Sequence, residues 1–507
     1  MGSEGVRLAR SATYIAIQGI VSGLSGIFYF AFAARLLPTV ADLGRVSALT
    51  MFSSLLATLF LLSLPSAITK YFAEGLGRGG HQEANRVALT GLKVGSSLAL
   101  IGSGLCLVLA PQLSSVFLGS ECDAFFFRLL AIDSFALILA PFVAAALGGA
   151  QQFKQLSMIS VSSSVIRSIG AVILLLFGLG ISGIIIAWIL GDFLYLFLAI
   201  FFYRRLVKGA EGGFPTVTMV RYSAPLYGSS ILSYLQSTID RYIVLGFVGA
   251  QVLGIYSPAN TAVLYVSSIS GAVASAILPK TSEMFGRGDL GGITRTTRAA
   301  SRYAALVYVP LAFGLAATAL PVIELFAGSR YSGGAPALAI LAIASTVLCF
   351  QYVLTTFFAA LGRTFIFLIS QIIALLVGTL TTVPLVIPLG ATGAAIGRST
   401  LTFAYLFVLI FYARKDLRSI LDWRSFTMAI AASAVMAICV AAVELFVYSK
   451  YLLPLYILIG GVVYLLMLRA LKVLNENDTR LLIGFVPSRL RRAAILLGEF
   501  LIGYKKQ

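Results

Sequence analysis

The chain has 507 residues, of which 59% are hydrophobic and only 11% are charged, and its mean hydropathy is +0.98. Soluble domains are nearer half apolar and a quarter charged, so this composition excludes a soluble enzyme, a disordered protein and a nucleic-acid-binding domain. The net charge of +18 lies in short basic blocks between apolar stretches, which is typical of a membrane protein with many spans.

Fourteen stretches are long and apolar enough to cross a bilayer as helices, which takes about 20 residues each. None shows the alternation of lipid-facing and lumen-facing residues that is typical of membrane β-strands. The sequence therefore predicts an all-α polytopic membrane protein. The predicted spans are residues 12–34, 46–66, 88–110, 125–148, 158–178, 182–202, 223–246, 254–278, 303–320, 336–360, 365–386, 392–411, 426–447 and 452–468.

The basic residues predict the orientation of these spans. With both termini in the cytoplasm, the inner segments hold 29 of the 37 Lys and Arg residues and the outer loops hold 4. Basic residues accumulate on the cytoplasmic side of a membrane, so we expect a multi-pass protein of the cell membrane with both termini inside. The outer loops are all short, which leaves no room for a catalytic domain.

The first span carries a polar face. It consists of Tyr14, Gln18, Gly19, Ser22, Gly23 and Ser25. Small residues at such spacing can let another helix approach closely, or the face could line a hydrophilic cavity. Gln18 is therefore a candidate residue of a substrate cleft.

Spans 4 to 6 contain four charged residues at membrane depth. A charge at the centre of a span costs about 2.5–3.5 kcal/mol, so such residues usually serve a function. Arg128 and Asp133 lie in span 4, Arg167 in span 5 and Asp192 in span 6. An arginine in a cleft would suit a phosphate group, and a lone carboxyl such as that of Asp192 could bind H⁺ or Na⁺. Each could instead have a structural partner.

An internal repeat links the two halves of the chain. Residues 74–79 recur at 283–288, residues 117–120 at 326–329, Gly44 at Gly254, Gly180 at Gly390, and Gly183 at Gly393. The offset stays at 209 or 210 residues, which is not expected by chance. Each copy holds six spans. Because six is an even number, we expect the two copies to share one orientation in the membrane.

The repeat predicts the domain organisation. Residues 1–210 form an N-terminal lobe, 211–416 a C-terminal lobe, 417–471 two appended spans, and 472–507 a cytoplasmic tail that is either amphipathic or simply basic. Two six-helix lobes are a transporter architecture in which a cleft opens to each side in turn. A duplicated scaffold and a channel are the alternatives, but a channel would usually repeat a filter loop.

Span 7 has a polar face like that of span 1. It includes Gln236 together with Tyr227, Ser229, Ser230, Ser233, Tyr234 and Ser237. We expect these two first helices of the lobes to share a hydrophilic cleft. Asp240 and Arg241 follow in the same span, and neighbours on a helix cannot pair well with each other. One of them could face the cleft and the other a neighbouring helix.

The second half adds two more charged candidates. Arg398 in span 12 could meet a phosphate, and Glu444 in span 13 could couple transport to an ion. The cleft candidates are therefore Arg241, Asp240, Arg398, Arg167, Asp133, Arg128, Gln18 and Gln236, and the ion-coupling candidates are Asp192 and Glu444.

Residues 240–257 begin with Asp240-Arg241 and include Gly246, Gly249 and Gly254. This stretch resembles the span 7–8 signature of polysaccharide flippases, which belong to the multidrug/oligosaccharidyl-lipid/polysaccharide exporter superfamily. Residues 64–74 resemble the end of its second span, and residues 34–44 are the first-lobe counterpart of the signature. The layout of two six-span lobes with two added spans is also similar. The cavity arginines of the family's lipid II branch have no match deep in span 1 or 2.

The resemblance implies a flippase. It would move a polyprenyl-diphosphate-linked oligosaccharide from the cytoplasmic to the outer leaflet by alternating access, for cell-surface polysaccharide or glycan assembly. Membrane lipids and glycan polymerases or transferases would be its partners. No nucleic acid, metal or cofactor is expected, because the chain has no phosphate-binding loop, one histidine and four widely spaced cysteines.

Two other functions stay open at this point. An ion-coupled multidrug or cation antiporter of the same superfamily would need an acidic cleft, with Asp133, Asp192 and Asp240 as candidates. A membrane glycosyltransferase or polymerase would need a large outer loop with carboxylates, which the sequence lacks. An arginine-lined cleft would favour the lipid-linked sugar, and an acidic one would favour a cation.

Overall fold

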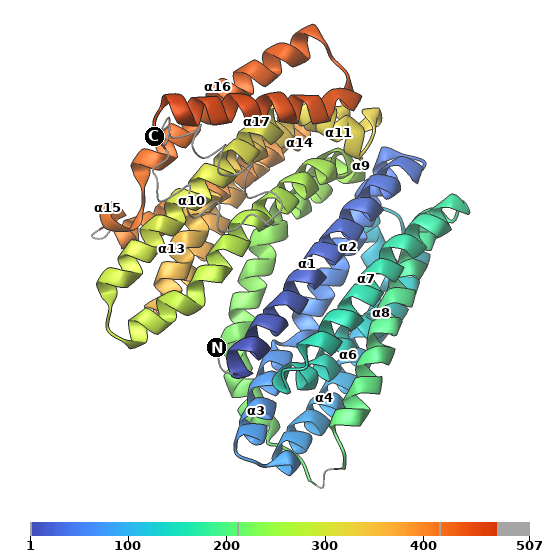
Figure 1. Cartoon of the computed structure of the whole chain (residues 1–507). Helices are drawn as coiled ribbons and strands as arrows, with labels where there is room; N and C mark the ends of the chain where they lie inside the picture. Colours follow the sequence, from blue (N-terminus) through green and yellow to red (C-terminus); the bar gives the residue numbers. More distant parts are fainter. Residues whose placement is uncertain (1–2, 210–211, 415–416, 474–507) are drawn as a thin grey trace. The chain divides into compact units, whose positions relative to one another are not determined.

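The computed structural model describes residues 3–209, 212–414 and 417–473 (Figure 1). All regular secondary structure in these ranges is helical, which confirms the predicted all-α class. Eleven helices are long and apolar enough to cross a membrane, or twelve if one bent pair is counted as a span. Two of the helices, α9 and α14, each contain two predicted spans, and the bent pair corresponds to predicted span 336–360, so together they account for all fourteen. Residues 474–507 of the predicted tail lie outside the described residues.

The helices cover the predicted spans, but predicted spans 46–66 and 336–360 are each divided between two helices. In chain order they are α1 (Ser3–Leu36), α2 (Val40–Leu61), α3 (Leu64–Gly77), α4 (His81–Val108), α5 (Ala110–Leu118), α6 (Ala124–Gly149), α7 (Phe153–Leu176), α8 (Gly180–Leu206), α9 (Thr216–Gly286), α10 (Leu290–Ala317), α11 (Ala319–Phe326), α12 (Ala335–Ser345), α13 (Leu348–Ala360), α14 (Phe365–Ala413), α15 (Leu417–Ile420), α16 (Trp423–Phe446) and α17 (Leu453–Ala470), with short 3₁₀ turns at Glu121–Asp123, Ser329–Gly334 and Lys450–Leu452. Helices α9 and α14 bend at Gly249 and Gly390, where the backbone leaves the helical conformation.

The first compact unit, Met1–Gly254, is built around α6. This helix contacts α2, α3, α4, α5, α7 and α8. Apart from Arg128, Asp133 and Ser134 it is apolar, and Ile138, Phe142 and Val143 are almost completely buried, as expected for a central helix. Helices α7 and α8 lie side by side, and α1 packs along α7 at the edge of the unit (Figure 1).

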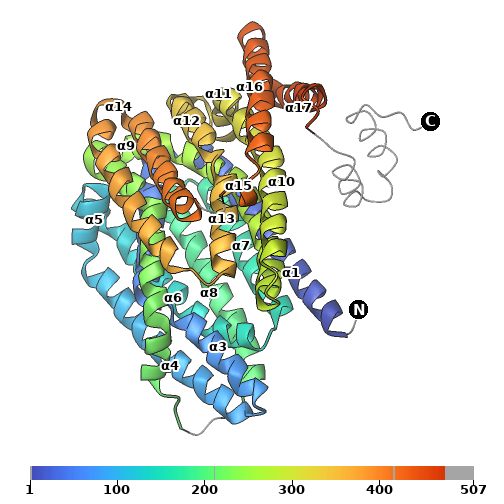
Figure 2. The same cartoon turned by 90° about the vertical axis from the view of Figure 1, so that its left-hand side faces the viewer.

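The second compact unit, Ile255–Gln507, is built around α10. Helix α10 packs against α12, α13 and α16, and α16 in turn packs against α17 (Figures 1 and 2). Tyr308 on α10 and Phe350 on α13 are almost completely buried, and Phe350 lies 4.4 Å from the ring of Phe426 on α16. The boundary between the units falls within α9. The lobes ending at residues 210 and 416, and their shared orientation, stay predictions.

Glycines at matching positions of the repeat have nearly the same positive φ angle. Gly79 and Gly288, which are 209 residues apart, have φ values of 73° and 74°. Gly180 and Gly390, which are 210 apart, both have a φ of 53°. Glycine adopts this left-handed conformation without the steric cost that other residues incur. The repeated glycines therefore build the same turns in both copies of the repeat.

The start of α2 touches α9 through residues that the repeat equates. A Cβ atom on Gly44 would overlap the carbonyl oxygen of Ala250, and one on Gly254 would overlap the carbonyl oxygen of Val40. Val40 and Ala250 are 210 positions apart, as are Gly44 and Gly254. The contact is thus reciprocal, like the contacts about a twofold axis between identical subunits. Only glycine fits at either position.

The connection between α1 and α2 is shorter than the predicted first outer loop. Helix α2 begins directly after Thr39, because Thr39 and Asp42 form a capping box in which each side chain accepts a hydrogen bond from the other residue's backbone N–H. Arg45, expected in the loop, lies in the second turn of α2. Its guanidinium is 3.5 Å from Asp42 and 3.9 Å from Asp123.

Candidate functional site

The helix of the second predicted span is broken at Leu62 and Ser63. Both residues have left-handed backbone conformations, with φ of 49° and 53°, although neither is glycine. Each such residue costs about 1–2 kcal/mol, and strain of this kind concentrates at functional sites. The break places the Ser63 hydroxyl oxygen 3.1 Å from that of Ser230 on α9. It was not predicted from the sequence, where span 46–66 is continuous.

A cavity of about 570 Å³ lies beside this break. We call it the hydroxyl cavity, because all its lining residues except Leu226 carry a hydroxyl group and none of those described is charged. They are Thr58, Ser63, Ser66, Leu226, Ser229, Ser230, Ser233, Tyr234 and Ser237. A surface of this composition offers hydrogen-bond donors and acceptors without a fixed charge.

Helix α9 supplies most of this cavity through one of its faces. Ser230, Ser233 and Ser237 follow each other at helical spacing, as expected for residues that share a face. Tyr234 holds α9 in place, because its hydroxyl donates a hydrogen bond to the Met51 carbonyl oxygen at 2.8 Å. The polar face predicted for span 7 is therefore gathered along one cavity, except that Tyr227 and Gln236 do not line it.

The second polar feature is a buried charge cluster made by Asp133 on α6, Arg167 on α7 and Asp192 on α8. Arg167 Nη1 donates to both carboxylate oxygens of Asp192, at 2.9 and 3.0 Å. Asp133 is 1% exposed and Asp192 is 7% exposed. The two carboxyl groups are within hydrogen-bonding reach of each other. Asp133 Oδ1 is buried and has no hydrogen-bond partner.

Two residues of α8 allow Arg167 to reach Asp192. A Cβ atom on Gly191 would overlap Cγ of Arg167, so the arginine side chain crosses α8 where there is no side chain to block it. The guanidinium carbon lies 5.5 Å from the centre of the Trp188 ring, within the range of a cation–π interaction. The packing of α7 on α8 thus fixes the direction of the guanidinium.

A cavity of about 530 Å³ opens beside Arg167 and Asp192. We call it the arginine cavity. Its polar lining comes from α1, α2, α7 and α8 and consists of Ser22, Tyr29, Thr50, Ser160, Ser163, Ser164, Arg167, Ser168, Trp188, Asp192 and Tyr195. Ser25 of α1 and Ser164 of α7 share a hydrogen bond of 2.9 Å near this cavity. The cavity can hold water next to the charge cluster.

Sequence reasoning found the three charged residues of the cluster and Ser22 in the polar face of span 1, but it missed the other polar residues around them. Helix α7 carries Ser160, Ser163, Ser164 and Arg167 at helical spacing. Helix α8 repeats the pattern with Trp188, Asp192 and Tyr195, and α1 with Ser22, Gly26 and Tyr29. Polar stripes of this kind on three helices were the signal that could have located the cavity.

The other predicted site residues are not members of this cluster. Asp240 and Arg241 are on α9, where Asp240 is buried and the Arg241 Nη2 atom donates to the Ser237 carbonyl oxygen at 3.2 Å. Arg128 on α6 is exposed. The remaining candidates are half-buried: Gln18 on α1, Gln236 on α9, Arg398 on α14 and Glu444 on α16. Their proposed roles stay predictions.

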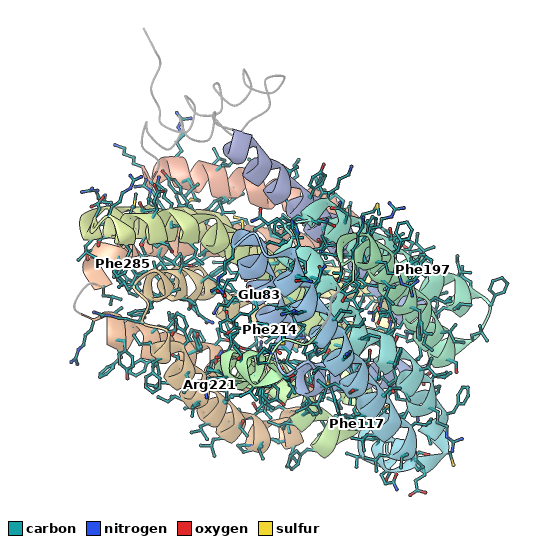
Figure 3. All side chains as sticks on the ribbon, turned by 90° about the horizontal axis from the view of Figure 1, so that it is seen from below. Glu83, Phe117, Phe197, Phe214, Arg221 and Phe285 are labelled. Atoms are coloured by element: carbon teal, nitrogen blue, oxygen red, sulfur yellow. The ribbon has the colours of Figure 1, made fainter. Side chains whose placement is uncertain are left out.

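Aromatic and charged side chains from distant segments meet at one end of the first unit. Figure 3 labels Glu83 of α4 there, together with Phe214 and Arg221 near the start of α9. The Phe214 ring is 5.2 Å from that of Tyr71 on α3, and the ammonium group of Lys70 lies 4.3 Å from the ring of Tyr222. These contacts hold the start of α9 against α3.

Residues 32–336 match a family model described as "Polysaccharide biosynthesis protein". The match covers more than half of the chain. The chain belongs to this polysaccharide biosynthesis protein family. No curated protein matches it by sequence.

Solved structures show which fold this polysaccharide biosynthesis protein has. It is similar to the lipid II flippase MurJ in an inward closed conformation, with a TM-score of 0.75 and 17% identity over 89% of this chain and 97% of that chain. It is also similar to an inward-facing multidrug resistance MATE family transporter of the MOP superfamily, with a TM-score of 0.62 and 16% identity over 80% and 98% of the two chains. A MOP superfamily transporter from Pyrococcus furiosus gives a TM-score of 0.58 and 16% identity over 81% and 95%. This multi-pass polysaccharide biosynthesis protein therefore has the all-helical transporter fold.

Proposed function

We propose that this protein is a flippase for a lipid-linked saccharide. It would carry a polyprenyl-diphosphate-linked oligosaccharide from the cytoplasmic to the outer leaflet of the cell membrane by alternating access. Membership of a polysaccharide biosynthesis family and a fold shared with a lipid II flippase support this function. On this proposal the protein moves its substrate without chemical change, so it is not an enzyme.

The hydroxyl cavity is the observation that carries the proposal. A sugar loses many hydrogen bonds to water when it enters a membrane, and each unreplaced bond is costly. The serine, threonine and tyrosine hydroxyls of this cavity could replace them. An uncharged polar lining suits a saccharide better than an amphiphilic cation, which would be expected to meet carboxylates.

Arg241 is the best candidate for the diphosphate of the substrate. It lies one helical turn beyond Ser237, which lines the hydroxyl cavity, and it donates to the Ser237 carbonyl oxygen. Its Nε atom is buried and makes no hydrogen bond. An N–H group of this kind could bind a phosphate oxygen. The polyprenyl chain would stay in the lipid.

The orientation rests on the positive-inside distribution of Lys and Arg, which favours cytoplasmic termini. The substrate would then be made and loaded on the inner side. Polymerases or transferases that use the saccharide would act on it after it has crossed. We propose these enzymes as functional partners.

Reconstitution tests the proposal directly. Purified protein in vesicles should move a fluorescent polyprenyl-diphosphate-linked disaccharide between leaflets, so that a membrane-impermeant quencher reaches all of the probe and not only its outer half. Protein-free vesicles should keep half of the probe protected, because a charged, hydrated headgroup does not cross hydrocarbon unaided. Equal protection with and without the protein would rule out the flippase.

Removing hydroxyls from the cavity should weaken saccharide binding. Each hydrogen bond contributes about 1 kcal/mol, so the combined replacement of Ser63, Ser230 and Ser233 by alanine should slow movement of the disaccharide probe by about 10–100-fold at low probe concentration. Ser97→Ala on α4 is the matched control, because the Ser97 hydroxyl bonds only its own helix, at the Lys93 carbonyl oxygen. Unchanged rates of probe movement in the triple variant would show that the hydroxyl cavity does not bind the saccharide.

One observation favours the cation antiporter as a second candidate. The cluster of Asp133, Arg167 and Asp192 has two carboxylates and one guanidinium, and MATE transporters share the fold. The same vesicles should therefore be tested with ethidium as a cation probe. Uptake of ethidium without movement of the disaccharide would favour the antiporter over the flippase.

A further inference from the structure

The charge cluster of the first unit has more acid than base. Arg167 is the only basic residue among the described residues lining the arginine cavity, and both oxygens of Asp192 accept hydrogen bonds from its Nη1 atom. The charge of Asp192 is therefore compensated. Asp133 is more deeply buried and contributes a second carboxyl group. With both carboxyls ionised, the cluster would hold one uncompensated negative charge away from water, which is strongly unfavourable.

Among the described residues, the helices around Asp133 supply no cation besides Arg167. Helix α4 presents the Cys106 thiol to Asp133, α1 presents Tyr29 to Arg167, and α8 presents Tyr195 to Asp192; all three groups are neutral in their ordinary state. Helix α2 presents the Thr50 hydroxyl to the adjoining arginine cavity.

The charged residues of α3, and those between α3 and the first turn of α4, form ion pairs with each other. Lys70 lies 3.7 Å from Glu74, and Arg78, which follows α3, lies 3.7 Å from Glu83 at the start of α4. Helix α5 carries no charged residue. The negative charge of an ionised Asp133 must therefore be neutralised by a cation or proton that binds to the cluster.

A proton fits this position better than a metal cation. The two carboxyl groups lie within hydrogen-bonding reach of each other, and such a pair needs a proton between its oxygens. A sodium ion would have to share Asp192 with the guanidinium of Arg167 and would be repelled by it. Among the described residues, no group of three or more His, Cys, Asp or Glu side chains could hold a metal ion.

We propose that Asp133 and Asp192 share one proton and form the site at which the transporter takes up and releases H⁺ during its cycle. This inference rests on the proposed flippase function and names its driving ion. Water in the arginine cavity delivers the proton and receives it again. When the proton leaves, Arg167 faces two ionised carboxyls in place of one.

Helix α1 can respond to this change. It packs along α7, which carries Arg167, and the Ser25–Ser164 hydrogen bond joins the two helices beside the cavity. Tyr29 and Ser22 of α1 line the same cavity as Arg167. A movement of the guanidinium between the two carboxyls therefore acts on the α1–α7 contact.

Infrared spectroscopy of the purified protein tests the shared proton without any substrate. At neutral pH the wild type should show the carbonyl stretch of a protonated carboxyl group, and this band should lose intensity in Asp133→Asn. The variant is nearly isosteric and leaves the Arg167–Asp192 pair intact. A spectrum with the same carboxylic acid band in both proteins would overturn the proposal.

Transport in vesicles tests the coupling. With a pH difference of one unit, wild-type protein should accumulate the disaccharide probe about tenfold in the leaflet facing the acidic side, if one proton is exchanged per substrate. Asp133→Asn should equilibrate the probe between leaflets but show no accumulation. A sodium gradient should have no effect on either protein.

Three results would contradict the proposal. They are accumulation driven by a sodium gradient, a pH response that survives in Asp133→Asn, and a pH response that is lost in Glu444→Gln on α16. A wild-type protein that does not move the probe at all would instead contradict the flippase function, and the infrared result would then stand by itself.

Discussion

Replacing Arg167 with methionine is expected to lower the free energy of unfolding by about 3–5 kcal/mol, because it leaves a buried carboxylate without its partner. Arg167 makes two hydrogen bonds to Asp192, which is 7% exposed. Methionine retains most of the apolar stem that crosses Gly191, so the loss reflects the charge. Denaturant unfolding in detergent, followed by circular dichroism, measures the change.

A matched substitution separates this effect from the general loss of a membrane arginine. Arg128→Met on α6 should change stability little, since Arg128 is exposed. Combining Arg167→Met with Asp192→Asn should recover at least half of the lost stability, because the orphaned charge is removed as well. Equal destabilisation by Arg128→Met and Arg167→Met would show that the ion pair is not the cause.

Adding a methyl group at the reciprocal glycine contact should also have a large effect. Gly44→Ala or Gly254→Ala would place a Cβ atom on a backbone carbonyl oxygen of the facing helix. Backbone cannot move aside as a flexible side chain can, so we expect each change to cost about 1–3 kcal/mol and to separate α2 from α9. Thermal unfolding of the purified variants measures the cost.

The control for this contact lies on the same helix. A Cβ atom on Gly246 would have nothing within 4 Å, so Gly246→Ala should be neutral or stabilising by about 0.5–1 kcal/mol. The double variant Gly44→Ala/Gly254→Ala should cost less than the sum of the single changes, because the first methyl group already separates the helices. Wild-type stability of Gly44→Ala would mean that α2 and α9 do not approach closely at this point.

Hydropathy was sufficient to predict the membrane-spanning helices of this protein. Apolar runs of the required length are visible in one sequence. Gly249 and Gly390, where α9 and α14 bend, fall between consecutive predicted spans. The break at Leu62 and Ser63 was not predicted, because neither residue is a known helix breaker. Pro65, at the start of α3, was the only local hint.

The charged site was predicted residue by residue but not as a cluster. Asp133, Arg167 and Asp192 stand out singly because charges are rare in spans. Which of them meet depends on how α6, α7 and α8 are rotated against each other, and one sequence does not reveal this. The sequence does not show that the Arg167 side chain crosses α8 at Gly191 either, since a glycine in a helix can have many explanations.

The matching turns at Gly79 and Gly288, and at Gly180 and Gly390, imply an ancestral gene duplication whose two products later diverged in their chemistry. With the same offset of 209 or 210, Asp133 corresponds to Ala342 or Ile343, Arg167 to Leu376 or Val377, and Asp192 to Leu401 or Thr402. The C-terminal copy of the repeat thus kept the bends of the N-terminal copy but has no ionisable side chain at any of these positions. A transporter with two similar halves would then have a single proton-coupling site, and its stoichiometry would be one proton per cycle.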